Sequence, residues 1–336
     1  MLGKGKMALT DNHKNAVTLQ VAGLKKYFPV HRGFFQRVAA RVKAVDGVDF
    51  EIGPGKSLGL VGESGCGKST VGRLILKLLE PDGGKIFYKG RDISHLSPRE
   101  MRPLRQEIQI VFQDPYGSLN PRMTIGQSID EGLRCVGLSK EGRKSRREEL
   151  LEMVGIWPGA ADRYPHEFSG GQRQRVGVAR SLSVNPSLII CDEPISALDV
   201  SIQAQIINLL NDLQSRLDLS YLFISHDLNV VSYISDRVAV MYLGHIMEYA
   251  DTESLFEKPL HPYTLALLSS VPKIDDTGTR GAHTPLKGDV PSPLDPPPGC
   301  KFQGRCPRVE ERCRKEEIQF SRFDGDHWVR CWKASP

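Results

Sequence analysis

The sequence lacks any long apolar run, and this absence limits the kinds of protein that it can encode. No stretch of its 336 residues approaches the roughly 20 consecutive apolar residues that a membrane-spanning helix needs. The apolar core of a secretory signal is also missing from the opening residues, MLGKGKMALTDNHKN. We therefore expect a cytoplasmic protein whose contact with a membrane is peripheral.

A large excess of one charge is missing as well. Lys and Arg number 45 and Asp and Glu number 40, which gives a formal net charge of +5. The densest basic cluster, at residues 143–147, lies beside Glu141 and Glu148. This mixture is typical of a solvated helix face rather than of a nucleic-acid-binding patch, so we expect no nucleic-acid partner.

Cysteine is scarce through most of the chain and concentrated at its end. Of seven cysteines, Cys66, Cys135 and Cys191 are scattered, whereas four lie within residues 300–336. These four are Cys300, Cys306, Cys313 and Cys331. In a chain expected to be cytoplasmic, such clustering favours metal ligation over disulfides.

The remaining pattern is that of an α/β protein. Strand-like and helix-like runs alternate over residues 17–270, and the apolar runs 57–61, 188–191 and 221–225 are typical of buried parallel strands. The pattern is mostly helical from residue 125 to about 180, which predicts a helical subdomain at about 114–182. Residues 1–16 are expected to be an N-terminal tail, and the proline-rich residues 271–299 a linker to the four-cysteine tail, 300–336.

A glycine-rich segment follows the first apolar run. The residues from Gly62 to Ser69, GESGCGKS, fit the pattern GxxxxGK[ST] and precede a helix-like run over residues 70–79. Glycines free backbone N–H groups to surround phosphates, while Lys68 is expected to reach the β- and γ-phosphates and Ser69 to bind Mg²⁺. Cys66, beside a helix N-terminus, either has a lowered thiol pKa or simply fills a tolerant position. The predicted nucleotide-binding residues are Gly62, Ser64, Gly65, Cys66, Gly67, Lys68, Ser69 and Thr70.

A pair of carboxylates follows the apolar run 188–191. Open α/β sheets place ligand groups at the carboxyl ends of their strands. We therefore expect Asp192 to hold Mg²⁺ and Glu193 to polarise the attacking water. Taken alone, the pair could simply cap a strand; the glycine-rich segment favours the functional interpretation.

A third motif points to a family. The residues Ser169-Gly170-Gly171-Gln172 precede a helix-like run, and with them the chain resembles the ATP-binding-cassette (ABC) ATPases. The resemblance implies that the N-terminus of this helix in one subunit faces the γ-phosphate bound by the other, through N–H donors and the helix dipole. The motif alone could also be a flexible turn. The implied fold is α/β: a P-loop ABC-type nucleotide-binding domain with a mostly parallel core sheet, an antiparallel β subdomain, a helical subdomain and a small cysteine-rich extension.

The same resemblance implies roles for other residues. Gln113 is similar to the glutamine that touches Mg²⁺, and His226 to the histidine that contacts the γ-phosphate. Phe28 is similar to the aromatic residue that stacks on adenine, before an apparent insertion at 31–42, and Asp199 closes a loop that crosses the dimer interface. The implied catalytic residues are thus Glu193, His226 and Gln113, and the implied Mg²⁺ ligands are Ser69, Gln113 and Asp192.

Motifs near the C-terminus narrow the resemblance to the ATPase subunits of bacterial oligopeptide and dipeptide importers. They are His261-Pro-Tyr-Thr264, the segment 297–307 and the segment 327–331. The implied cofactors are ATP and Mg²⁺. The implied partners are two transmembrane permease subunits, a homologous ATPase subunit (or a second copy of this chain) and, indirectly, an extracytoplasmic solute-binding protein. These would act at the cytoplasmic face of the plasma membrane. Import of a sugar or nickel, or a soluble cassette acting on nucleic acid, are the alternatives.

The four C-terminal cysteines have spacings of x5, x6 and x17, which match no common zinc pattern of paired knuckles. Loose spacing and a proline after the second cysteine favour an iron–sulfur cluster, and the resemblance implies a [4Fe-4S] centre. Zinc, unligated thiols and disulfides are the alternatives. We expect a structural role, because a short tail with few apolar residues gains folding energy from metal ligation.

Overall fold

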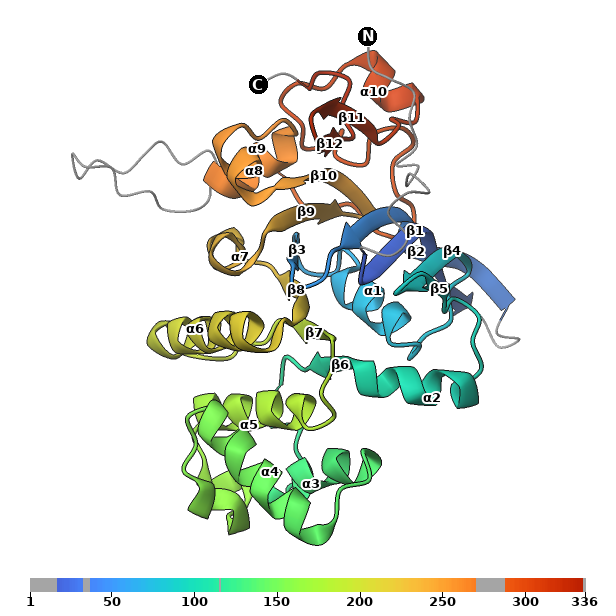
Figure 1. The fold of residues 1–336 in the computed structure, drawn as a ribbon. Helices are drawn as coiled ribbons and strands as arrows, with labels where there is room; N and C mark the ends of the chain where they lie inside the picture. The colour runs from blue at the N-terminus through green and yellow to red at the C-terminus, as the bar shows by residue number, and fades with distance from the viewer. Residues whose placement is uncertain (1–16, 33–36, 115, 270–287, 335–336) are drawn as a thin grey trace, which may run out of the picture. The chain divides into compact units, whose positions relative to one another are not determined.

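The structure, a computed structural model, describes residues 17–32, 37–114, 116–269 and 288–334. The chain divides into two compact units, which we describe separately (Figure 1). Unit 1 comprises the described residues within 1–51, 58–95 and 225–336, and unit 2 those within 52–57 and 96–224. No helix in the described ranges is long and apolar enough to cross a membrane. The predicted N-terminal tail and most of the predicted linker lie outside these ranges.

Unit 1 contains an antiparallel sheet with the strand order β2-β1-β4-β5. Its strands are β1 (Leu19–Arg32), β2 (Arg37–Ile52), β4 (Gly83–Tyr88) and β5 (Arg91–Asp92). The register of β1 against β4 shifts between Ala22 and Lys25, at Gly23, which has a φ of 57°. The Gly23 N–H donates to the Asp49 carboxylate at 2.7 Å, so the bulge is tied to β2.

The second set of strands in unit 1 has the order β11-β12-β10-β9-β3. The strands are β3 (Ser57–Val61), β9 (Arg237–Tyr242), β10 (His245–Asp251), β11 (Ser321–Asp324) and β12 (His327–Val329). Strand β3 is parallel to β9, whereas β10 is antiparallel to both β9 and β12. The C-terminal tail therefore adds two strands to a sheet whose other strands come from much earlier in the chain.

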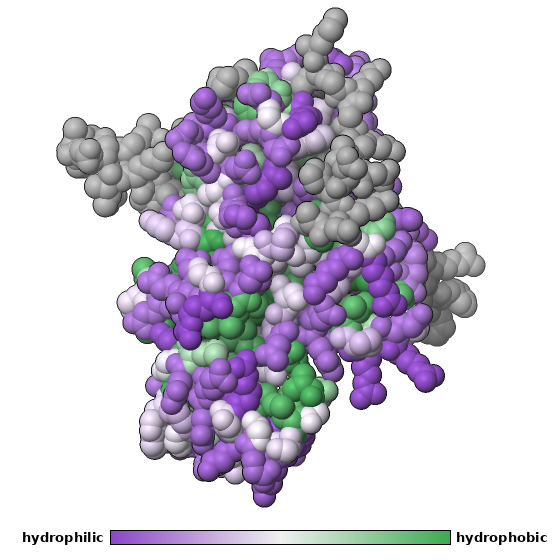
Figure 2. Space-filling view, in the orientation of Figure 1, coloured by the Kyte–Doolittle hydropathy of each residue, from purple (hydrophilic) through white to green (hydrophobic). Residues whose placement is uncertain are grey.

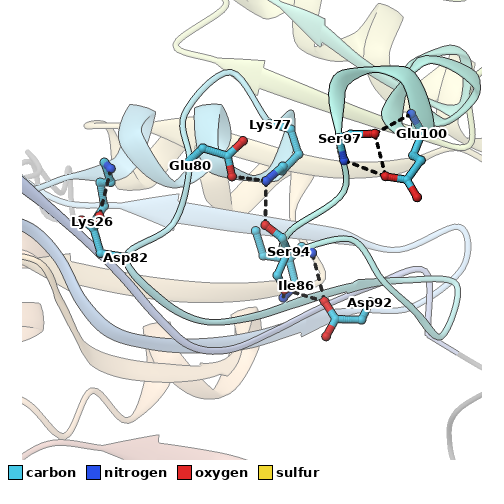
Figure 3. A network of polar contacts seen from close by, with 9 residues as sticks. All are labelled: Lys26, Lys77, Glu80, Asp82, Ile86, Asp92, Ser94, Ser97 and Glu100. Atoms are coloured by element: carbon cyan, nitrogen blue, oxygen red, sulfur yellow. Dashed lines mark hydrogen bonds and ion pairs between the residues drawn. The ribbon is translucent and has the colours of Figure 1, made fainter.

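The helices of unit 1 are α1 (Lys68–Ile75), α7 (Leu228–Ile234), α8 (Thr252–Glu257), α9 (Pro262–Ser269) and α10 (Glu311–Lys315). Helix α1 ends earlier than the sequence pattern predicts, because Lys77 adopts a left-handed conformation with a φ of 53°. The Lys77 ammonium donates to the carbonyl of Ser94 at 2.6 Å and to the Glu80 carboxylate (Figure 3). This buried lysine fixes the turn after α1 against the end of the antiparallel sheet.

Unit 2 contains three parallel strands in the order β8-β7-β6 and the helices α2 to α6. The strands are β6 (Ile108–Val111), β7 (Leu188–Asp192) and β8 (Ser220–Ser225). The helices are α2 (Pro98–Glu107), α3 (Ile125–Cys135), α4 (Lys140–Met153), α5 (Gly170–Leu182) and α6 (Val200–Leu217). Two 3₁₀ turns, Pro158–Asp162 and Pro165–Glu167, precede α5.

Helix starts in unit 2 are fixed by local side-chain caps. Ser97 and Glu100 form a reciprocal capping box at α2, visible in Figure 3, and Thr124 and Gln127 form another at α3. Each box supplies partners for backbone N–H groups that a helix N-terminus leaves unpaired.

The face drawn in Figure 2 is mostly hydrophilic, and its green patches show where hydrophobic residues reach the surface. The most exposed large hydrophobic side chains of unit 2 are those of Val200, Trp157 and Tyr116.

Candidate nucleotide-binding and catalytic site

The loop between β3 and α1 requires glycine at both ends. Gly62 and Gly67 have φ values of 154° and 112°, which side-chain-bearing residues rarely adopt. A Cβ atom on Gly62 would lie 2.1 Å from the carbonyl oxygen of Met241, and one on Gly67 would lie 2.0 Å from that of Ala44. The loop therefore passes too close to neighbouring backbone for any other residue to fit at these two positions.

Lys68, the first residue of α1, holds its charge inside this loop. Its side chain is buried, and its ammonium donates to the carbonyl oxygens of Gly62 at 2.7 Å and Glu63 at 3.1 Å. It also lies 3.8 Å from the Cys66 sulfur. In this arrangement the carbonyls of the loop itself stabilise the ammonium, which is available to exchange them for stronger, anionic acceptors.

The Cys66 thiol is not activated. Burial raises the pKa of the Cys66 thiol, and the neighbouring charge of Lys68 opposes this only in part. The thiol is therefore protonated at neutral pH, and the lowered pKa considered from its place beside a helix N-terminus is wrong. Cys66 contributes instead through its backbone, whose carbonyl accepts the Gly244 N–H at 3.0 Å.

At the end of β7, in unit 2, the predicted catalytic residue Glu193 is in contact with another, Gln113. Asp192 is buried, and the next residue, Glu193, has a φ of 46°. The Glu193 N–H donates to the Ile224 carbonyl at 3.0 Å, and its carboxylate accepts the Gln113 amide at 3.1 Å. A left-handed conformation at a non-glycine residue costs about 1–3 kcal/mol, so the surrounding structure holds this carboxylate in a defined direction.

The signature motif begins helix α5. The Ser169 hydroxyl accepts the Gln172 N–H at 3.3 Å, and the Gln172 side chain accepts the Ser169 N–H at 3.0 Å. A Cβ atom on Gly171 would lie 2.4 Å from a methyl carbon of Ile202 on α6, so glycine lets the two helices approach closely. Ser169, Gln172 and Asp199, the residue that precedes α6, are exposed.

Side chains of α5 attach the loop that follows β6. The Arg173 guanidinium lies 3.8 Å from the centre of the Tyr116 ring, and the Gln174 amide donates to the Phe112 carbonyl at 3.4 Å. Arg180 donates to the carbonyl of Ser118. The loop is thus held through backbone carbonyls and through one face of the Tyr116 ring, and the Tyr116 residue as a whole remains 65% exposed.

The remaining predicted site residues lie in unit 1. Phe28 is partly exposed on β1, with the Lys26 ammonium 5.7 Å from the centre of its ring. The adjacent Tyr27 is tied down by a hydrogen bond from its hydroxyl to Asp46 at 2.6 Å. His226 follows β8 and is exposed.

Comparison with known proteins identifies the family to which the chain belongs. Residues 45–196 match the family described as ABC transporter, and residues 247–313 match the oligopeptide/dipeptide transporter C-terminal region. The chain is 53% identical over 316 residues to the oligopeptide transport ATP-binding protein AppF of Bacillus subtilis (strain 168). That match covers 93% of this chain and 96% of AppF. The chain belongs to the ABC transporter family.

Solved structures of ABC cassettes have the same fold. CbiO1 from Clostridium perfringens, part of the ABC transporter complex cbiONQ, is 27% identical with a TM-score of 0.63, covering 72% of this chain and 91% of its own. The dimeric cassette MJ0796 in a post-hydrolysis state with ADP and Pi is 27% identical with a TM-score of 0.62, covering 70% and 98%. These matches confirm the predicted α/β ABC fold and the ATPase activity of the chain. They do not confirm the cysteine-rich extension.

The four cysteines of this ABC protein's tail are free thiols. The Cys300 N–H donates to the Cys313 carbonyl at 2.8 Å, and burial, with a smaller contribution from the other three thiols, raises the pKa of Cys300 to about 12. The pKa values of Cys306 and Cys331 are also raised, chiefly by burial. Among the described residues, no three or more His, Cys, Asp or Glu side chains are grouped so that they could hold a metal ion. The predicted [4Fe-4S] cluster, and zinc as its alternative, are therefore not supported. The thiols lie near enough to act on one another's pKa values, but they do not form a group that could hold a metal ion.

The tail of the ABC protein is anchored by a buried carboxylate that the sequence did not single out. Glu248 on β10 is fully buried and accepts the N–H groups of Leu260 at 2.7 Å and His261 at 2.9 Å. Its carboxylate also lies 2.7 Å from the imidazole of His327 on β12. The only sequence signal for Glu248 is its place in the stretch that leads to the His261–Thr264 motif.

Acidification is expected to destabilise unit 1 through His261. Burial lowers the pKa of His261 to about 4, against an ordinary 6.5; Glu248 opposes the shift and Arg330 adds to it. Between these values the unfolded chain binds a proton that the folded chain does not, so stability falls as pH falls through this window. Thermal unfolding measured at intervals across it will show the decline.

The control for this prediction is His261→Gln, whose side-chain oxygen can still accept the Tyr263 N–H that His261 Nδ1 accepts at 3.0 Å. This variant will unfold with a weaker dependence on pH over the same range. Equal slopes for the two proteins would contradict the assignment.

Proposed function

We propose that this ABC ATPase energises the import of di- and oligopeptides through a separate membrane permease at the cytoplasmic face of the plasma membrane. The observation that carries the proposal is the match of residues 247–313 to the C-terminal region of oligopeptide and dipeptide transporters. The name of AppF, to which the chain is 53% identical, supports it. Cassette motifs alone would not, because one fold serves many transported solutes.

We propose the following division of roles for ATP hydrolysis. The backbone of Gly62–Ser69 surrounds the phosphates, and Lys68 exchanges its carbonyl acceptors for phosphate oxygens. Ser69, Gln113 and Asp192 offer oxygen ligands of the kind that Mg²⁺ prefers, and the ion would neutralise phosphate charge. Glu193, aimed by its backbone and by Gln113, accepts a proton from the attacking water. Phe28 stacks on adenine and His226 contacts the γ-phosphate.

We further propose that two ATPase subunits act together. Each chain has one phosphate loop and one Ser169–Gln172 motif, and each site would take its loop from one chain and its motif from the other. The dimeric structure of MJ0796 supports this arrangement. The partner would be a homologous ATPase subunit, with this chain's own second copy as the alternative. Both would bind two permease subunits, and an extracytoplasmic solute-binding protein would deliver the peptide.

The transported solute is the part of this proposal that a cell-based assay tests. Cells that lack this gene should regain uptake of a radiolabelled tripeptide when they express the native chain, but not when they express Lys68→Ala. Uptake of labelled sugar and of nickel should be unchanged by either. Restored uptake of sugar or nickel, with peptide uptake unaffected, would contradict the peptide assignment while leaving the ATPase intact.

The exposed ring of Tyr116 is expected to dock on the permease. It lies in the segment 113–125, which α5 holds through the Ser118 carbonyl and through Arg173 stacked on the Tyr116 ring. Burial of the rest of this exposed ring by a partner would stabilise a complex. Tyr116→Glu should keep the ATPase activity of the purified chain and lose most of the peptide uptake in cells. The matched control is Tyr233→Glu, which changes a tyrosine that is 76% exposed on α7 of unit 1. Equal peptide uptake by the two variants would count against docking at Tyr116.

A further inference from the structure

Two groups from the C-terminal region hold the second residue of the phosphate loop. The Arg305 guanidinium makes a two-point ion pair with the Glu63 carboxylate, at 2.6 Å and 3.0 Å. The Glu63 N–H donates to the Tyr263 hydroxyl at 3.0 Å. Tyr263 lies 200 residues and Arg305 lies 242 residues further along the chain, in the region that matches the oligopeptide/dipeptide transporter C-terminal family.

The groups that hold Glu63 are themselves fixed by packing. The Tyr263 ring contacts those of Tyr242, at 4.7 Å between centroids, and Phe302, at 5.3 Å, and Phe302 meets Tyr242 edge to face at 5.5 Å. All three aromatic residues are fully buried. The side chain of Arg305 is only 6% exposed, so the ion pair has little freedom to rearrange. An arginine fork on a carboxylate also fixes orientation as well as charge.

The position of Glu63 gives this contact a consequence for nucleotide binding. Glu63 places a negative charge inside a loop that is built to receive phosphates, and the carbonyl of the same residue accepts a hydrogen bond from Lys68. The hydrogen bonds to Glu63 raise the pKa of the Arg305 guanidinium, which is therefore charged at every physiological pH. Without Arg305, the Glu63 carboxylate would repel an incoming triphosphate, and the Glu63 side chain would lose the ion pair that fixes its orientation.

We propose that Arg305, together with Tyr263, is a positioning residue for the phosphate loop: it neutralises Glu63 and fixes its orientation, so that the C-terminal region sets the affinity for ATP. The inference rests on the proposed role of Gly62–Ser69 as the phosphate-binding loop. In this proposal the tail acts on the nucleotide site through Arg305 and not through its cysteines.

The test is the dissociation constant for ATP, measured by fluorescent-nucleotide titration on the full chain. Arg305→Ala should weaken ATP binding about tenfold, because it lets the phosphate loop shift and leaves the Glu63 charge unpaired beside the phosphates. The kcat at saturating ATP should change less. Arg305→Lys should restore part of the affinity because it keeps the charge. Glu63→Gln combined with Arg305→Ala should bind more tightly than Arg305→Ala alone, because no uncompensated carboxylate is left.

Two variants separate positioning from a purely structural role. Arg330→Ala removes a partly buried tail arginine whose side chain donates to the Ile246 and Ile318 carbonyls rather than to the loop. It should lower the melting temperature without the tenfold loss of affinity. Glu63→Gln removes the carboxylate charge but keeps a side-chain oxygen that can accept from Arg305, so it should bind ATP at least as tightly as the native chain; this result decides the matter if Arg305→Ala does not fold.

The outcomes are distinct. Native affinity in Arg305→Ala, the same loss of affinity in Arg330→Ala, or weaker ATP binding in Glu63→Gln would each overturn the inference. Because added salt screens the repulsion between Glu63 and phosphate, the deficit of Arg305→Ala should also shrink as ionic strength rises, and a deficit independent of salt would contradict charge neutralisation. If Lys68→Ala bound ATP normally, the assignment of the loop itself would fail. If Lys68→Ala lost affinity for ATP but Arg305→Ala did not, only the role of Arg305 would be rejected.

Discussion

A Glu193→Gln variant will bind ATP as the native chain does but will hydrolyse it about 10²- to 10⁴-fold more slowly, the range expected when a general base is removed. Glutamine has the shape of glutamate and can keep the contact with Gln113, so the fold and the strained backbone at this position are preserved. Only the negative charge that accepts the proton of water is lost. Steady-state phosphate release and ATP titration measure the two properties separately.

The matched control is Glu141→Gln, which removes a carboxylate from the exposed start of α4. Its turnover will be unchanged. Because ATP stays bound but uncleaved, Glu193→Gln will also accumulate as an ATP-bound dimer, visible by gel filtration. Near-native turnover in Glu193→Gln would contradict the role of Glu193 as the base.

Lys68→Ala will lose affinity for ATP itself, by about 10- to 100-fold, because a hydrogen bond from a charged donor contributes about 1.5–3 kcal/mol. Lys68 is 4% exposed and its ammonium bridges the carbonyls of Gly62 and Glu63, so alanine also removes a support of the loop. Fluorescent-nucleotide titration measures the loss.

The control for this variant is Lys140→Ala, because Lys140 is also the first residue of a helix but is exposed. It will bind ATP with native affinity. Native affinity in Lys68→Ala, or equal losses in the two variants, would exclude the proposed contact with phosphate.

The parts of the fold that sequence could predict are those encoded by local pattern. The apolar runs at 57–61 and 188–191 are strands β3 and β7, and the glycine-rich segment between β3 and α1 has the backbone that its glycines predict. The contact between Gln113 and Glu193 was less accessible, since Glu193 was predicted from its place after a strand but Gln113 only from the family resemblance. The left-handed backbone of Glu193 could not be predicted, because nothing in its side chain requires it.

The tail was predicted least well, for a physical reason. Its composition suggests too few apolar residues for a core, and from this we expected metal to supply folding energy. In the structure, Phe302, Trp328 and Val329 are buried, and β12 pairs with β10, about 80 residues earlier. The missing half of this core belongs to another part of the chain, so the composition of the tail alone cannot show it. The ion pair of Arg305 with Glu63 is hidden from sequence for the same reason.

The most direct test of the central claim is ATP hydrolysis in proteoliposomes that contain this chain, its partner ATPase and the permease. We expect hydrolysis to rise when peptide-loaded solute-binding protein is added on the side of the membrane opposite the ATPases, and labelled peptide to appear with it on the ATPase side. Replacing this chain with Glu193→Gln should suppress both signals. Hydrolysis that ignores peptide, or that rises with a sugar or nickel instead, would contradict the account.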